Sequence, residues 1–449
     1  MNKIELGLPI LLLGTIIAGM KMTPPIQRLT PPQAQKIPKD VTVHQDTRID
    51  DYYWLKERDT QPVLDYLKAE NDYTFAKMKH TELLQKTLYN EMRGRIKEDD
   101  TTVPYKFGNY MYYTRTEEDL QYDIYCRKLG NSSGDEEITL NMNEMAKKHD
   151  YIDLSAYKIS PNEKLLALTI DTSGAELHKL IVKDIKTGEI LDDHLSNLDG
   201  SVEWANDNKT LFYTVLDKAH RSYQLWRHEL GDEQSDDLLV LQEDDDRFSV
   251  GLHRTKSGEF LKMDLESQIT TEVYLLDRND PFGEWELVQL REQGVEYYVY
   301  HRGDYLYQIT NKDAINFKMI RTTLKGGKED EIIPNRDKTT LDNVSMFKNH
   351  MAVLERVNGN RAIRLFHFED ASWYNTEMNA NIYSLTFEEN YDWNSDFFRF
   401  GYGSFKTPYS VYDIDFKTHN KTLRKKEEIL GGYESENYVS ERIWAPTHD

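Results

Sequence analysis

The spacing of apolar residues predicts helices near the start of the chain. Between residues 61 and 97, apolar side chains recur at intervals of three and four positions, the period of an amphipathic helix. Pro62 is compatible with the first turn of a helix, where its missing N–H is not needed. The pattern predicts two helices in this range, and their apolar faces require a covering partner. The residues that set the spacing are Val63, Leu64, Leu67, Leu84, Leu88 and Met92.

After residue 100 the pattern changes to short apolar runs separated by turns. The clearest example lies between residues 157 and 191, where apolar runs at 165–170 and 180–185 flank a loop that contains Ser173-Gly174. A turn at Ser160-Pro161-Asn162 precedes the first run. Such punctuated runs predict an antiparallel hairpin.

Weaker copies of this hairpin recur at intervals of about 45 to 55 residues, the spacing of propeller blades. We therefore predict a mainly β fold: a seven-bladed β-propeller preceded by an α-helical N-terminal segment. A β-sandwich or a solenoid is the alternative, but either would need shorter and more even repeats. The seven units begin near Tyr105, Tyr157, Val202, Phe248, Val295, Val344 and Phe397.

Composition supports a large, strand-rich core and excludes some partners. The chain has 449 residues, of which 39% are hydrophobic, and its 29 tyrosines and 7 tryptophans favour strands. Its formal net charge of −22 argues against nucleic acid and suits either high solubility or a cationic partner. Cys126 is the single cysteine, so neither an internal disulfide nor a thiolate metal site is expected.

The N-terminus carries an apolar run that is short for a bilayer span. The run extends from Leu6 to Met20 and follows Lys3, which is compatible with a secretory signal. Met20 and Met22 are also plausible start codons, so an over-extended reading frame is the alternative. Residues 1–36 are thus predicted to be an extension and linker. The compartment, cytoplasmic or periplasmic, stays open, and no stable membrane association is expected.

A search for catalytic or binding motifs finds none. A serine hydrolase of the α/β type needs a G-x-S-x-G turn, which the sequence lacks. Ser404, in GYGSF, and Ser173 are interpreted as turn residues. Gly326-Gly327 and Gly431-Gly432 are loop glycines without a following phosphate-binding helix. We predict no catalytic residue and no cofactor.

No metal site is predicted either. The acidic run at 243–246 lacks the spaced glycine and terminal glutamate of a calcium loop, so it is interpreted as a solvated loop. The histidines form no cluster with ligand spacing. Those in the predicted sheets, expected at the surface or packed, are His178, His220, His228 and His253.

Several longer strings carry a specific resemblance. They are DTRIDDYYWL (46–55), RIKEDDTTVPYKFGNYMYYTRTEEDLQYDIYCRK (95–128), ISPNEKLLALTIDTSG (159–174), WANDNKTLFYTVLD (204–217) and GGYESENYVSERIWA (431–445). Together they resemble the oligopeptidase B (protease II) branch of the prolyl oligopeptidase family, over about residues 37–449.

The resemblance implies a two-part serine peptidase. In that family a seven-bladed propeller caps an α/β-hydrolase domain that cleaves short peptides after Arg or Lys, and the propeller acts as a size filter. It implies that 37–100 packs on the hydrolase domain, that 101–435 is the propeller and that 436–449 begins the crossing into the hydrolase. The family's catalytic triad would lie beyond Asp449, so it is assigned to no residue of this chain.

Three hypotheses follow. In the first, the gene is truncated, split or frameshifted, and its product, the N-terminal part of a family peptidase, is inactive alone. In the second, a separate chain carrying the hydrolase domain completes the enzyme. In the third, the acidic propeller is a stand-alone module that binds basic peptides. The expected partners are accordingly a hydrolase domain and short basic peptides, with no nucleic acid.

Overall fold

The computed structural model describes residues 29–130, 134–378 and 380–448 and divides the chain into two compact units. The first unit ends at Gly94 and the second begins at Arg95. The predicted signal-like run from Leu6 to Met20 lies outside the described residues. Within the described ranges, no helix is both long enough and apolar enough to span a membrane.

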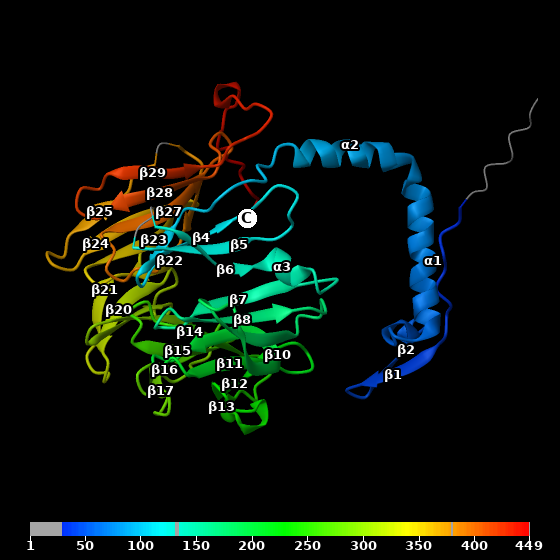
Figure 1. The fold of residues 1–449 in the computed structure, drawn as a ribbon, viewed down its shortest axis with the longest axis horizontal. Coiled ribbons are helices and arrows are strands. Elements are labelled where there is room, and N and C mark those ends of the chain that lie inside the picture. The colour runs from blue at the N-terminus through cyan, green and yellow to red at the C-terminus, as the bar shows by residue number, and fades with distance from the viewer. Residues whose placement is uncertain (1–28, 131–133, 379, 449) are drawn as a thin grey trace, which may run out of the picture. The chain divides into compact units, whose positions relative to one another are not determined.

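The first unit is a hairpin followed by a helical run (Figure 1). His44 and Gln45, at the tip of the hairpin, both have positive φ angles, of 51° and 68°, which suits a tight hairpin turn. The helical run starts next to Pro62 and ends before Gly94. In chain order the elements are β1 (Lys39–Val43), β2 (Asp46–Asp50), η1 (Tyr53–Lys56), α1 (Gln61–Met78), η2 (Lys79–Thr81) and α2 (Glu82–Arg93).

The predicted α-helical segment is therefore too broad. Residues 39–50 form a β-hairpin, and the helical part is one continuous run of 33 residues from Gln61 to Arg93. Residues 79–81 continue the helical backbone as a 3₁₀ turn, so no loop separates the two halves. The sequence contains no glycine or proline there, which explains why the helical backbone is not interrupted.

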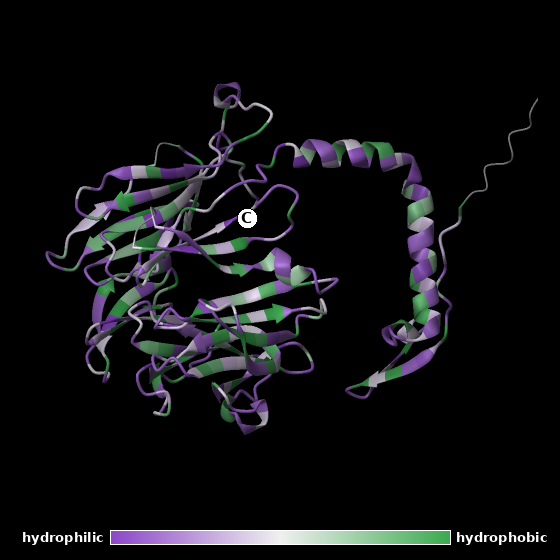
Figure 2. Cartoon of the chain, viewed as in Figure 1, coloured by the Kyte–Doolittle hydropathy of each residue, from purple (hydrophilic) through white to green (hydrophobic). Residues whose placement is uncertain are grey.

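The helical run has almost no core of its own. Among the described residues of the first unit, Val63 is the only buried apolar side chain. Figure 2 shows apolar residues along both helices. Several large ones are strongly exposed, among them Phe75 at 77% and Leu83 at 79%. Tertiary packing normally stabilises such a helix by covering its apolar face.

The second unit is built from antiparallel sheets, five of which have four strands in sequence order. The first contains β3 (Tyr105–Phe107), β4 (Tyr110–Arg115), β5 (Ile124–Leu129) and β6 (Glu136–Asn141). The next two contain β14 (Ser249–Arg254), β15 (Phe260–Glu266), β16 (Thr271–Asp277) and β17 (Glu286–Gln289), then β18 (Tyr297–Arg302), β19 (Tyr305–Thr310), β20 (Lys318–Thr323) and β21 (Asp330–Ile333). The last two contain β22 (Thr339–Met346), β23 (His350–Val357), β24 (Asn360–His367) and β25 (Trp373–Asn375), then β26 (Ser384–Phe387), β27 (Phe397–Gly403), β28 (Ser410–Asp415) and β29 (Lys421–Lys426).

The remaining strands form a single seven-stranded sheet. Its strand β10 (Ile190–Trp204) is 15 residues long and pairs with β9 on one side and β11 on the other. The short helices are α3 (Met142–Ala146), η3 (Gln234–Asp236) and η4 (Ser435–Asn437). The other strands of this sheet are β7 (Asp153–Ile159), β8 (Leu165–Asp171), β9 (His178–Asp184), β11 (Thr210–Leu216), β12 (Ser222–Glu229) and β13 (Leu238–Gln242).

The prediction of seven separate blades is wrong. The structure has five four-stranded blades, and the units expected to begin at Tyr157 and Val202 are fused into the seven-stranded sheet. The polar stretch before Val202 is part of β10 and does not separate two units. It remains in the ladder because Leu198 pairs with both His178 and Val215 and so continues the strand across the expected boundary.

The core lies between neighbouring sheets. One apolar cluster joins Phe212 and Leu225 of the seven-stranded sheet to Leu252, Leu261 and Met263 of the next. Equivalent clusters join the other neighbouring sheets. Each sheet therefore buries its faces against its neighbours, as propeller sheets must.

The first and last sheets share no strand, so side chains hold them together. Arg399 of β27 donates to the carbonyl oxygen of Pro104 at 2.8 Å. Asp100, ahead of β3, pairs with Lys425 of β29 at 2.5 Å. The rings of Tyr105 and Tyr391 also pack at 5.0 Å between centroids.

Candidate functional site

A cavity of about 890 Å³ lies among the sheets of the second unit. The turns after β3, β7 and β14 line it, together with the ends of β10 and β22 and the loop after β26. Most of its walls are thus turns and strand ends at one end of the sheets. This volume is within the range of ligand cavities, about 300 to 1,000 Å³.

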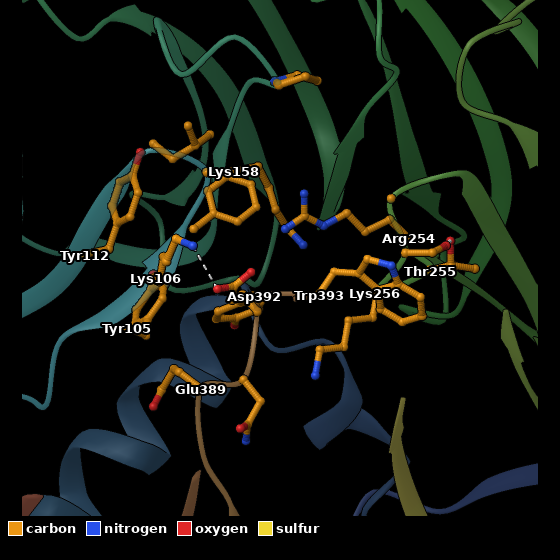
Figure 3. Close-up of a pocket in the computed structure, with 18 of the residues that line it drawn as sticks. Tyr105, Lys106, Tyr112, Lys158, Arg254, Thr255, Lys256, Glu389, Asp392 and Trp393 are labelled. Carbon is orange, nitrogen blue, oxygen red and sulfur yellow. Dashed lines mark hydrogen bonds and ion pairs between the residues drawn. The ribbon is translucent and has the colours of Figure 1, made fainter. Parts of the chain in front are cut away.

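Acidic and basic side chains face each other across part of the cavity (Figure 3). Lys106 pairs with Asp392 at 3.0 Å, a contact between the first and last sheets. Lys158 of β7 pairs with Glu203 of β10 at 2.5 Å. These ion pairs join the first sheet to the last and β7 to β10.

The turn between β14 and β15 carries further polar groups into the cavity. Gly258 has a φ of +79°, which favours glycine, and its N–H donates to Thr255 at 2.9 Å to close the turn. Ser257 lies 2.8 Å from Nδ1 of the buried His301, whose Nε2 is 2.6 Å from the carbonyl oxygen of Gly303. With Nε2 donating to that carbonyl, Nδ1 accepts from Ser257, and the pair orients the turn.

Lys256, in this turn, is an unusual lysine. Its Nζ donates to Ser345 at 3.0 Å and lies 3.1 Å from the centroid of the Phe347 ring. Burial lowers the pKa of Lys256 to about 6, although the charge of Asp392 opposes this shift. Burial therefore favours the uncharged form of this amine.

Two arginines lie close to this turn. Arg278, which follows β16, donates to the carbonyl oxygens of Trp204 at 3.0 Å and Gly258 at 3.1 Å. Burial, together with the charge of Arg254, lowers the pKa of Arg278 to about 10. Arg254 stacks on the ring of Phe107, at 4.7 Å from its centroid.

The two serines considered from the sequence lie outside this cavity. Ser173 donates to Asp171 at 2.7 Å in the loop after β8. Ser404 accepts from the N–H of Thr407 at 3.0 Å in the loop after β27. Neither contact is a serine–histidine pair.

The histidines occupy separate places. His253 borders the cavity, His220 lies in an exposed turn and His178 is buried in β9. His228 is fully buried between two carboxylates. Among the residues that the structure describes, no three His, Cys, Asp or Glu side chains are grouped to hold a metal ion. The absence of metal ligands, cofactors and catalytic residues stays a prediction.

The acidic run at 243–246 is partly engaged in ion pairs. Glu243 pairs with Arg291 at 2.6 Å, and Asp245 pairs with Arg247, also at 2.6 Å. The run is a loop between β13 and β14 in which Asp244 and Asp246 are exposed, while the ion pairs of Glu243 and Asp245 hold it to neighbouring residues.

The basic residues of the cavity were missed at the sequence level. Arg254 and Lys256 are close in sequence, but Arg278 follows two strands later, and no short motif connects the three. The only usable signal was the hairpin register of β14, β15 and β16, which brings these strand ends together.

Comparison with known proteins places this architecture in a family. Residues 32–427 match the family described as prolyl oligopeptidase, N-terminal beta-propeller domain. Protease 2 of Moraxella lacunata is 30% identical over 425 residues, which cover 92% of this chain and 61% of that protein. Dipeptidyl aminopeptidase BI of Pseudoxanthomonas mexicana is 32% identical over 466 residues, with coverages of 98% and 64%.

Solved structures of similar proteins have the same fold as this chain. Oligopeptidase B from Leishmania major has a TM-score of 0.87 at 27% identity and covers 92% of this chain and 63% of its own. Oligopeptidase B from Trypanosoma brucei, with covalently bound antipain, has a TM-score of 0.85 at 28% identity, with coverages of 91% and 62%. The chain thus spans about three fifths of the length of these relatives. It belongs to the prolyl oligopeptidase family and carries that family's N-terminal propeller domain, in a form similar to oligopeptidase B.

Proposed function

We propose that this chain is the substrate-gating part of a serine peptidase similar to oligopeptidase B. The observation that carries the proposal is the cavity of about 890 Å³ among the sheets of a family propeller. A cavity of this size accommodates a few amino-acid residues but excludes a folded domain. Short peptides would pass and folded proteins would not.

Basic peptides are the proposed substrates. The net charge of −22 favours the approach of cationic peptides through long-range attraction. Cleavage after Arg or Lys is proposed on the likeness to oligopeptidase B. The charge alone also supports the second candidate, a propeller that only binds basic peptides, and this weaker proposal predicts binding that added salt reduces.

The catalytic residues are proposed to come from a hydrolase domain outside these 449 residues, on the same polypeptide or on another one. The sequence has no G-x-S-x-G turn to hold a nucleophilic serine. In the described part of the first unit, the helices expose Phe75, Leu83 and Met92, which supports packing against another surface. Exposed Ile443 and Trp444 support the same role for residues 436–449.

A chimera tests the gating role. This chain would replace the matching part of Protease 2 from Moraxella lacunata, leaving that protein's remaining sequence intact. We expect hydrolysis of a short Arg-linked chromogenic peptide and no cleavage of a folded protein with exposed arginines. Equal cleavage of both substrates would contradict a gate. The unmodified Protease 2 is the matched control.

A further inference from the structure

Three histidines other than the four considered above lie together where the last two sheets of the propeller meet. His350 begins β23, His367 ends β24, and His419 lies in the turn between β28 and β29. The ring centroids of His350 and His367 are 4.8 Å apart, and those of His367 and His419 are 5.8 Å apart. The sheets β22–β25 and β26–β29 thus share a cluster of titratable rings.

Aromatic stacking makes the cluster part of the contact between these two sheets. The ring of His350 stacks on that of Phe416, directly after β28, with 4.3 Å between centroids. The ring of His419 stacks on that of Tyr374, in β25, at 3.6 Å. Each stack joins a residue of the sheet β22–β25 to a residue of the turn after β28.

His350 occupies a place that suits a neutral ring. It is only 6% exposed, and its Nδ1 is buried without a hydrogen-bond partner among the described residues. Protonation would turn both ring nitrogens into N–H donors. A charged His350 would therefore hold an unsatisfied buried N–H and a buried charge next to His367, and both are costly.

The electrostatic surroundings act in the same direction. Burial, together with the charge of His367, lowers the pKa of His350 to about 4 and also lowers the pKa of His419. Neighbouring carboxylates favour the charged form of His350 but do not reverse this direction. The charged residues around the three rings, on the adjoining strands and turns, are Arg302, Glu369, Asp370, Asp396, Asp415 and Lys417.

A hollow of about 650 Å³ reaches the cluster. His350, His367 and His419 all line it, so water and protons can reach the rings without unfolding of the sheets. Its lining residues differ from those of the larger cavity described above. The cluster is therefore a separate feature of the propeller.

We propose that His350, His367 and His419 form an acid-sensitive contact that loosens the last two sheets from each other as the pH falls. The rings are neutral in the closed contact, and protonation favours a state in which the two ring stacks separate. Ser345 of β22 and the loop after β26 belong to the same two sheets and line the larger cavity, so loosening would also displace a wall of that cavity. The inference does not depend on the proposed gating role.

The direction and size of the pH effect follow from His350. When the contact opens, this ring regains the ordinary histidine pKa of about 6.5, so the open state binds a proton where the closed state does not. The closed contact is therefore most stable above about pH 7 and loses stability as the pH falls toward about 4. Between about pH 7.5 and pH 5.5, the equilibrium constant for opening should rise about tenfold.

Hydrogen exchange of the full chain, measured by mass spectrometry at about pH 7.5 and pH 5.5, tests the contact. Exchange rates are corrected for their intrinsic dependence on pH, so the remaining protection reports the opening of each segment. We expect peptides that cover β23 and the turn after β28 to lose about tenfold in protection at the lower pH. Peptides that cover β16, in a distant sheet, are the internal control and should change little.

Variants assign the effect to the histidines. His350→Phe keeps a ring against Phe416 but takes up no proton, so it should abolish most of the loss of protection. His419→Phe removes a second titratable ring and should reduce the loss. His194→Phe, at an exposed histidine of β10, is the matched control and should leave the loss unchanged.

Near-ultraviolet circular dichroism confirms that each variant is folded. The proposal is overturned if protection of β23 is the same at both pH values, if β16 loses as much protection as β23, or if folded His350→Phe loses as much as the original protein. Should His350→Phe fail to fold, an undiminished loss in folded His419→Phe would overturn it instead.

Discussion

At the scale of single residues, His228 lies between two buried carboxylates. Its side chain is fully buried, with Nδ1 2.7 Å from Asp237 and Nε2 3.3 Å from Asp193. Tyr213 donates to the other oxygen of Asp237 at 2.7 Å, and the N–H of Gly231 donates to Asp193 at 2.5 Å. Burial lowers the pKa of His228, but the two carboxylates outweigh burial and raise the pKa above its usual value.

This arrangement predicts that part of the stability is lost as the pH rises. Because the folded-state pKa of His228 is raised, its contribution is complete below about pH 6.5, the ordinary histidine value, and disappears as the pH passes the folded-state value. His228→Gln should lower the free energy of unfolding by about 3–5 kcal/mol at pH 6, the cost of breaking a buried pair.

Urea unfolding at pH 6 and pH 9 checks this prediction. The original protein should lose stability between these two values by more than the variant does. His194→Gln, at an exposed histidine of β10, is the control. An equal loss in the original and in His228→Gln would show that His228 is not charged in the folded state.

At the scale of elements, the backbone conformation and packing of β10 require a glycine at one position. Gly200 has a φ of +111°, and a Cβ built there would lie 2.3 Å from Oγ of Ser155. Gly200→Ala should therefore destabilise the protein by about 1–3 kcal/mol. The comparison is Gly231→Ala, at a φ of +99° with open space around it, which shares the backbone cost without the clash.

Thermal unfolding of the two variants separates the cost of the steric clash from the cost of the backbone conformation. A larger loss in Gly200→Ala supports close packing of β10 on β7. Equal losses would mean that only backbone conformation matters there.

Some strands could be predicted from the sequence and others could not, depending on whether their apolar residues form a recognisable pattern. The hairpin of β8 and β9 was predicted because apolar runs with a punctuating loop reveal strands directly. The continuity of β10 was not predicted, because its many polar residues are typical of a loop. In the structure, however, Asp193, Leu195 and Leu198 of this strand are buried. Turn-like composition does not reveal whether neighbouring strands keep the backbone in a ladder.

The cavity was beyond sequence reasoning for a different reason. Arg254, Lys256 and Arg278 line one cavity only when the strands β14, β15 and β16 are placed in register. A similar argument applies to the ion pair between Lys106 and Asp392, which joins the two ends of the propeller sequence.

At the scale of the propeller unit, Arg399 holds the first and last sheets together. It is 2% exposed and pairs with both oxygens of Asp413, at 2.7 and 3.1 Å, while it also donates to Pro104. Because these sheets share no strand, loss of the contact should weaken the whole ring.

Arg399→Gln is predicted to lower the free energy of unfolding by about 3–5 kcal/mol, because it leaves a buried carboxylate poorly paired. The half-exposed Arg424 contacts the same Asp413 at 3.3 Å, so Arg424→Gln is a matched control, with an expected loss of about 0–1 kcal/mol. Chemical unfolding of both variants gives the comparison, and equal losses would exclude a special role for Arg399.

We propose that this chain gates a peptidase without supplying its chemistry. The most direct test is hydrolysis of an Arg-linked chromogenic dipeptide by the purified 449-residue protein, with and without a serine-directed phosphonate. We predict no hydrolysis above the uncatalysed rate, since no nucleophilic serine turn is present in the sequence. Hydrolysis that the phosphonate abolishes would contradict the claim.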